Sequence, residues 1–221
     1  MKKLLGILLI LSMTTSVFSE ENELQITERL AYQGHSKAQF LLGYLYDKGK
    51  GISQDFNQAV YWYSKSAEKG YSKAQSKLGF MYIQGRGVSQ DYKEAIYWYK
   101  KAAEQGAAEA QYNLGLIYLE GEGVEQDNKL AAYWFKKAAE QGAADAQYNL
   151  GYLYEFGLGV TADYLKGHMW FNISVYSGYA NAVKAIDSIS EKMTSEQIAE
   201  AQQMAKEWVE KFENRQISEA H

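Results

Sequence analysis

Apolar side chains recur along the chain at the spacing of α-helices, and the pattern is clearest in residues 108–143. Four of them fall at i, i+4, i+7 and i+8 and predict a helix with one buried stripe: Ala110, Leu114, Ile117 and Tyr118. Gly121 and Gly123 favour a stop after it, because glycine adopts the positive φ of a helix end. Asp127 then stands as the N-cap of a second helix. That helix carries a second inward stripe, formed by Ala131, Trp134, Phe135 and Ala138.

The same helix pair recurs at a step of 36 residues. Alanine, leucine and tryptophan all keep this step, at Ala38, Ala74, Ala110 and Ala146, at Leu42, Leu78, Leu114 and Leu150, and at Trp62, Trp98, Trp134 and Trp170. Such self-similarity indicates one structural unit copied along the chain. We therefore predict four repeats, at residues 36–71, 72–107, 108–143 and 144–179.

Glycine also recurs inside the first helix of every repeat, at Gly43, Gly79, Gly115 and Gly151. A glycine in a helix interior costs about 1 kcal/mol relative to alanine. Its repetition predicts that the second helix approaches too closely there for a Cβ atom.

The two ends depart from the repeat, as the ends of an array must if they are to shield its core from water. Residues 22–35 fit the second helix of an incomplete repeat. Residues 180–212 fit C-terminal capping helices, the last of them over about 195–212, with Thr194 and Gln197 as its capping box. Its apolar residues are spaced to cover the last repeat: Ile198, Ala201, Ala205, Trp208 and Phe212. Residues 213–221 are assigned to a tail.

Residues 1–19 have the features of a signal peptide. Lys2 and Lys3 precede an apolar run, Leu4–Leu11, and small side chains near Ser19 suit cleavage after that residue. The alternatives are an uncleaved membrane anchor or a buried first helix. We expect a mature protein without a membrane span, located in the periplasm or secreted.

The amino-acid composition limits the kinds of site and partner that the chain can have. Hydrophobic residues make up 47% of the chain and charged residues 23%, which are globular values. There is no cysteine, which excludes disulfides, thiolate metal sites and cysteine nucleophiles. A formal net charge of -4 without a basic stripe argues against nucleic acid as a partner.

The motif A-x-x-x-L-G-x-x-Y, followed by G-x-G-V, D, W-Y/F and K-A-A-x-x-G, resembles the Sel-1-like repeat, a relative of the tetratricopeptide repeat. AQYNLGLIYLEGEGVEQDNKLAAYWFKKAAEQG is a close match, and the resemblance covers roughly residues 22–212. It implies an all-α, right-handed α/α superhelix, or solenoid, of helix-turn-helix repeats. Members of the family are mostly adaptors or scaffolds for protein complexes, and many bacterial members are exported.

In such superhelices the first helix of each repeat lines a concave groove. At 100° per residue, four positions of that helix point away from its core stripe, and they are 37, 40, 44 and 47 in the first repeat. With two flanking asparagines, these positions give our candidate partner-binding residues: Phe40, Tyr44, Lys73, Phe80, Glu109, Tyr112, Asn113, Leu116, Asp145, Tyr148, Asn149 and Tyr152. The alternative interpretation is that the aromatic residues among them pack against the next helix and are mostly buried.

The sequence contains no pattern that indicates a catalytic, metal or cofactor site. The three histidines, His35, His168 and His221, stand far apart in an extended array. A few cysteine-rich members of the family have been linked to β-lactam binding or hydrolysis, but this chain lacks their cysteines. We expect a non-enzymatic protein that binds a peptide or protein partner. The alternatives are a cell-envelope hydrolase, acting on a β-lactam or on peptidoglycan, and a secreted factor that binds host proteins.

Overall fold

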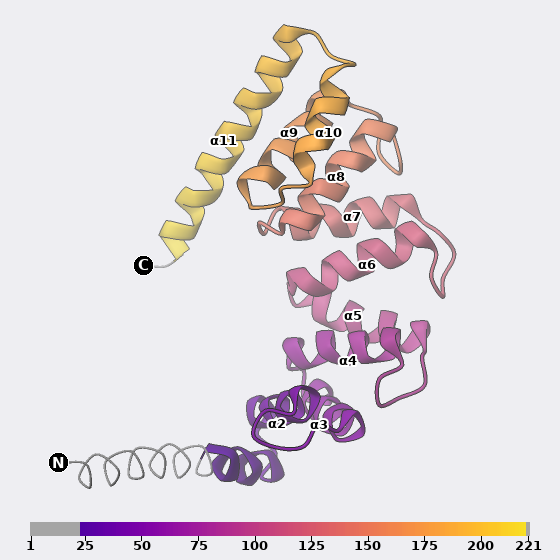
Figure 1. Ribbon diagram of the computed structural model, residues 1–221, viewed down its shortest axis with the longest axis vertical. Coiled ribbons are helices and arrows are strands. Elements are labelled where there is room, and N and C mark those ends of the chain that lie inside the picture. Colours follow the sequence, from indigo (N-terminus) through magenta and orange to yellow (C-terminus); the bar gives the residue numbers. More distant parts are fainter. Residues whose placement is uncertain (1–22, 220–221) are drawn as a thin grey trace, which may run out of the picture. The chain divides into compact units, whose positions relative to one another are not determined.

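The computed structural model describes residues 23–219, and every regular element within that range is a helix (Figure 1). A helical segment over residues 23–32 comes first. It is followed by α2 (Ser36–Lys48), α3 (Phe56–Glu68), α4 (Ser72–Gln84), α5 (Tyr92–Glu104), α6 (Ala108–Glu120), α7 (Asn128–Ala139), α8 (Ala144–Phe156), α9 (Tyr164–Tyr176), α10 (Ala182–Ser190) and α11 (Ser195–Glu219). The predicted fold class, an all-α solenoid of helix-turn-helix repeats, is confirmed.

The chain divides into two compact units, Met1–Ala102 and Ala103–His221, and each is described by itself. Among the described residues, unit 1 holds the helical segment 23–32, α2, α3, α4 and most of α5. Unit 2 holds α6 to α11. In both units, α2, α4, α6 and α8 are the first helices of their repeats, and α3, α5, α7 and α9 are the second helices.

Local capping sets the boundaries of each helix pair. The predicted N-cap Asp127 and the aspartates at the same position of the other repeats accept hydrogen bonds from backbone N–H groups of the following turn, at 2.8–3.1 Å: Asp55, Asp91, Asp127 and Asp163. These bonds satisfy amide groups that have no partner within the helix. The first helices end at a glycine in the left-handed conformation, with φ of 64° at Gly49 and 73° at Gly121.

The mid-helix glycines lie against aromatic rings of the second helix. A Cβ atom at Gly115 would lie 2.5 Å from two ring carbons of Phe135, and one at Gly151 would lie 2.7 Å from the ring of Phe171. Gly43 and Gly79 are in the same position relative to Tyr63 and Tyr99. The predicted close approach is therefore present, and the atoms that require it belong mainly to the ring rather than to the helix backbone.

Buried glutamines tie each first helix to the end of the preceding second helix. In unit 1, the Gln39 side-chain amide donates to the carbonyl of Ala31 at 3.2 Å, and that of Gln75 donates to Ala67 at 3.1 Å. In unit 2, Gln111 and Gln147 make the same bond to Ala103 and Ala139, at 3.0 and 3.2 Å. Each bond adds a side-chain donor to a carbonyl near the end of a helix, which also accepts from the backbone N–H of the glycine three residues later.

The core of unit 1 consists of two clusters. Ala59, Val60, Tyr63, Ala67, Ala74, Leu78 and Met81 join α3 to α4. Ala31, Ala38, Leu42 and Trp62 join the segment 23–32 to α2 and α3. The ring of Tyr32 packs edge-on against Trp62, with centroids 5.0 Å apart. The helical segment 23–32 thus covers the first complete repeat.

In unit 2, α11 runs alongside α9 (Figure 1). Ala201 and Ala205 are buried, and Trp208 packs against Trp170 with ring centroids 5.4 Å apart. Phe212 stacks on Trp208 at 5.1 Å. The predicted capping box is present, because Thr194 N–H donates to the Gln197 side chain at 2.9 Å and Gln197 N–H donates to the Thr194 hydroxyl at 3.3 Å.

Two details differ from the predictions. The final helix continues past residue 212 to Glu219, because no glycine or proline follows Phe212 to end it. Trp134, expected to point inward, is only half-buried, as is Trp98. Trp62 and Trp170 are buried, because the segment 23–32 and α11 cover them.

The predicted signal peptide at residues 1–19, its cleavage site and His221 all lie outside the described residues. Within residues 23–219, none of the helices has both the length and the apolar composition needed to cross a membrane.

Candidate functional site

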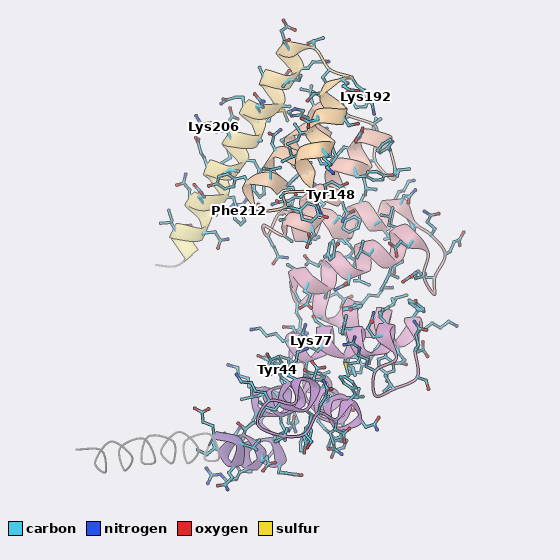
Figure 2. All side chains as sticks on the ribbon, viewed as in Figure 1. Tyr44, Lys77, Tyr148, Lys192, Lys206 and Phe212 are labelled. Carbon is cyan, nitrogen blue, oxygen red and sulfur yellow. The ribbon has the colours of Figure 1, made fainter. Side chains whose placement is uncertain are left out.

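The first helices present two sets of candidate binding residues, one in each unit, and the unit 1 set adds Lys37 and Leu41 to the residues predicted from the sequence. The unit 1 face consists of Lys37, Phe40, Leu41 and Tyr44 on α2 and Lys73 and Phe80 on α4. The unit 2 face consists of Glu109, Tyr112, Asn113 and Leu116 on α6 and Asp145, Tyr148, Asn149 and Tyr152 on α8. Figure 2 labels Tyr44 and Tyr148, one from each face.

Phe40 in unit 1 and Tyr112 and Tyr148 in unit 2 share one position of the repeat, and this set of half-buried rings is called the inner row. Each packs on the aromatic ring that lies over a mid-helix glycine: Phe40 on Tyr63 at 5.7 Å, Tyr112 on Phe135 at 5.9 Å, and Tyr148 on Phe171 at 5.5 Å. Burial raises the pKa of both Tyr112 and Tyr148, and for Tyr112 the nearby Asp145 carboxylate adds to the effect. The alternative interpretation, that these aromatics pack within the fold, therefore applies to this row.

Tyr44 and Phe80 in unit 1 and Tyr152 in unit 2 share one position of the repeat, a helical turn further along, and this set is called the outer row. Their exposed fractions are 37%, 37% and 38%. The equivalent residue of the third repeat, Leu116, is half-buried. Large apolar side chains that recur at one exposed position are candidates for contact with a partner, because an exposed apolar row is not needed to fill the core.

Asn113 and Asn149 are engaged with their own helix. The Asn113 side-chain amide donates to the carbonyl of Glu109 at 2.8 Å, and that of Asn149 donates to the carbonyl of Asp145 at 3.0 Å. Both residues remain candidates for a contact with a partner, but part of their hydrogen-bonding capacity is already used.

Several residues at the four positions expected to point away from the core are buried instead. Asp47 pairs with Lys48 at 3.0 Å, and Glu155 pairs with Lys192 at 2.7 Å. The carbonyl of Asp47 also accepts from Gln54, so the loop after the helix covers the last turn. Ser76, at the position of Phe40, is too short to reach the surface and is buried.

Leu41 was missed by the angular argument, although 43% of its surface is exposed. It occupies the position that Asn113 and Asn149 fill in unit 2. An apolar residue at a position that is polar in the later repeats is the sequence signal that could have identified it.

The two faces carry opposite charge. In unit 1, α4 contains Lys73 and Lys77 and no acidic residue, and the only acid of α2 is the buried Asp47. In unit 2, α6 and α8 contain acidic residues and no lysine or arginine. Each face therefore favours a partner segment of the opposite charge.

Two of the three histidines lie in the described residues. His35 precedes α2 in unit 1, whereas His168 is buried in α9 of unit 2. Within residues 23–219 no three side chains of histidine, aspartate or glutamate come together as metal ligands would.

The sequence model of the Sel1 repeat matches four successive segments, residues 36–71, 72–106, 108–142 and 144–179. The match covers more than half of the chain. The chain belongs to the Sel1 repeat family. Sel1 repeats commonly build protein–protein interaction scaffolds.

Solved structures agree with this assignment. A protective antigen of uropathogenic Escherichia coli strains with an SLR fold is 38% identical, with a TM-score of 0.79 over 86% of this chain and 41% of that one. A Sel1 repeat protein from Oxalobacter formigenes is 38% identical, with a TM-score of 0.71 over 77% of this chain and 49% of that one. This Sel1 repeat chain thus spans less than half the length of both. No protein of curated function matches it in sequence.

A shorter relative is also similar. A putative Sel1 repeat protein from Klebsiella pneumoniae is 26% identical, with a TM-score of 0.50 over 76% of this chain and 83% of that one.

Proposed function

We propose that this Sel1 repeat chain is a non-enzymatic scaffold that binds a peptide or protein segment along its first helices. The observation that carries the proposal is the outer row. Tyr44, Phe80 and Tyr152 leave more than a third of their surfaces exposed at one position of the repeat. The inner row beneath it is fixed by ring packing, so a partner would meet a preformed surface and little ordering would oppose binding.

The second helices provide a matched control for the outer row. They carry three exposed tyrosines at one repeat position, Tyr61, Tyr97 and Tyr133. A lysine one turn later lies over each of these rings, at 5.0–5.7 Å from the centroid. These tyrosines match the outer row in number and in being aromatic and exposed, but they lie on the other helix of the pair.

The test is capture of partners by crosslinking in the native cell. We expect wild type and a Tyr61→Ser, Tyr97→Ser, Tyr133→Ser variant to capture the same set. A Tyr44→Ser, Phe80→Ser, Tyr152→Ser variant should lose it. If the outer-row variant keeps every partner, or if both variants lose them equally, the proposed surface is wrong. Turnover of nitrocefin or peptidoglycan by the purified protein would favour the hydrolase alternative.

We also infer that the protein acts outside the cytoplasm, in the periplasm or after secretion. The basis is the charged and apolar pattern of residues 1–19. An external location suits both a scaffold within the cell envelope and a factor that binds host proteins, and cell fractionation separates these two roles.

A further inference from the structure

The unit 1 face combines exposed cations with exposed apolar side chains. Lys37 and Lys73 are both exposed, and each lies in the first turn of its helix. The positive end of a helix dipole disfavours a cation there. In unit 2 the same positions carry Glu109 and Asp145, which suit the dipole. The two lysines are therefore not explained by the stability of their own helices.

Apolar surface lies beside these cations. Leu41 and Tyr44 are exposed on α2, and Phe80 is exposed on α4. The guanidinium group of Arg86 lies 5.8 Å from the ring centroid of Phe80 and 5.8 Å from that of Phe56, which adds a third cation next to the aromatic surface. Each lysine precedes its aromatic partner by seven residues, or about 10 Å along the helix axis. The unit 1 face thus has a cationic edge and an apolar edge.

A ring contact between Phe40 and Tyr71 joins the two helices of this face. Phe40 of α2 packs edge-on against Tyr71, the residue before α4, with ring centroids 5.2 Å apart. Tyr71 directly precedes Ser72, where α4 begins, and Lys73 follows. This contact fixes the start of α4 against α2, so the cationic edges of the two helices belong to one surface.

We propose that the unit 1 face binds an acidic peptide segment that also carries aliphatic or aromatic side chains, an assignment that rests on the proposed scaffold function. Carboxylates of the segment pair with Lys37, Lys73 and Arg86, and its apolar side chains cover Leu41, Tyr44 and Phe80. The anionic helices α6 and α8 repel such a segment, so the segment binds the unit 1 face in preference to the unit 2 face. A nucleic acid is disfavoured, because the chain has a formal net charge of -4.

The test is fluorescence anisotropy with the full chain and four labelled probes. One peptide alternates glutamate with leucine. A second has lysine in place of glutamate, and a third has serine in place of leucine. The fourth probe is an oligothymidine of similar length. We expect the glutamate–leucine peptide to bind at least about tenfold more tightly than the other three probes.

Variants with reversed side-chain charge test whether the peptide binds at the unit 1 face. Lys37→Glu with Lys73→Glu should weaken binding of the glutamate–leucine peptide by about tenfold. Lys93→Glu with Lys129→Glu is the matched control, because these two exposed lysines occupy the second position of α5 and α7. Both double variants change the net charge equally, and glutamate in a first turn suits the helix dipole, so both should fold. The control should change affinity by less than about twofold.

Four results would overturn the assignment. In the first, the control variant weakens binding of the glutamate–leucine peptide as much as the Lys37→Glu, Lys73→Glu variant does. In the second and third, the lysine peptide or the oligothymidine binds as tightly as the glutamate–leucine peptide. In the fourth, the glutamate–leucine peptide does not bind. The scaffold function fails separately, if the outer-row variant keeps every native partner. If that variant loses its partners while Lys37→Glu, Lys73→Glu keeps them, the scaffold function holds and the acidic partner is wrong.

Discussion

His168 shows how one residue can make a repeat sensitive to pH. It is fully buried in α9, at the position that Val60 occupies in the first repeat. The Asn172 side-chain amide lies 2.8 Å from Nδ1 of His168, and Nε2 is buried without a hydrogen-bond partner. Burial lowers the pKa of His168 from its ordinary value of 6.5. The folded protein therefore holds this imidazole neutral.

Acidification should destabilise the wild-type protein through this residue. Because the folded-state pKa lies below the unfolded-state value, the unfolded chain takes up the proton first. The contribution to stability is complete above about pH 6.5 and is lost as the pH falls through the folded-state value. Urea unfolding at pH 7.5 and at pH 5 should therefore show a larger loss for wild type than for His168→Val. Equal losses in the two proteins would contradict this account.

At the scale of the element, the helix pair is held together by a ring seated on a glycine. The sequence predicted both the glycine and the close approach, because a mid-helix glycine repeated four times needs a reason in packing. The sequence did not predict the burial of Asp47 and Glu155, because the angle of 100° per residue describes one helix alone and not its contacts with neighbouring segments. The burial of Glu155 depends on Lys192, which is 37 residues away in sequence.

Gly115→Leu should destabilise the protein by about 1–3 kcal/mol, because the new side chain would collide with the ring of Phe135. The measurement is the free energy of unfolding in urea. Glu120→Leu, at an exposed position of the same helix, is the control and should stay within about 0.5 kcal/mol of wild type. A double variant that combines Gly115→Leu with Phe135→Ala should be more stable than Phe135→Ala alone. A Gly115→Leu protein as stable as wild type would show that the ring does not need the glycine.

At the scale of the whole molecule, the period of 36 residues determined nearly all of the predicted helices. It also gave the repeat positions that we propose for contact with a partner. Which of those positions are exposed could not be read from the period, since exposure depends on side-chain size and on neighbouring loops. Phe40 and Tyr44 lie four residues apart on one helix, yet one packs on Tyr63 and the other is exposed.

Export is a prediction about the whole chain. The mature protein should begin at Glu20, which an intact mass of the protein from the periplasmic or extracellular fraction would measure. Leu8→Arg interrupts the apolar run and should keep the uncleaved chain in the cytoplasm, whereas Leu8→Ile should be exported normally. Recovery of full-length protein from the outer fractions would point to an uncleaved anchor instead.

The packing of α11 on α9 also bears on how such an array can be lengthened. Trp208 packs on Trp170 and Phe212 stacks on Trp208, so a further copy placed after residue 179 would have to displace α11 from that surface. A copy inserted between α7 and α8 would leave α11 and its contacts with α9 intact. Duplication of internal repeats is therefore the route by which a protein engineer, or unequal recombination, could extend this chain without rebuilding its closing helix.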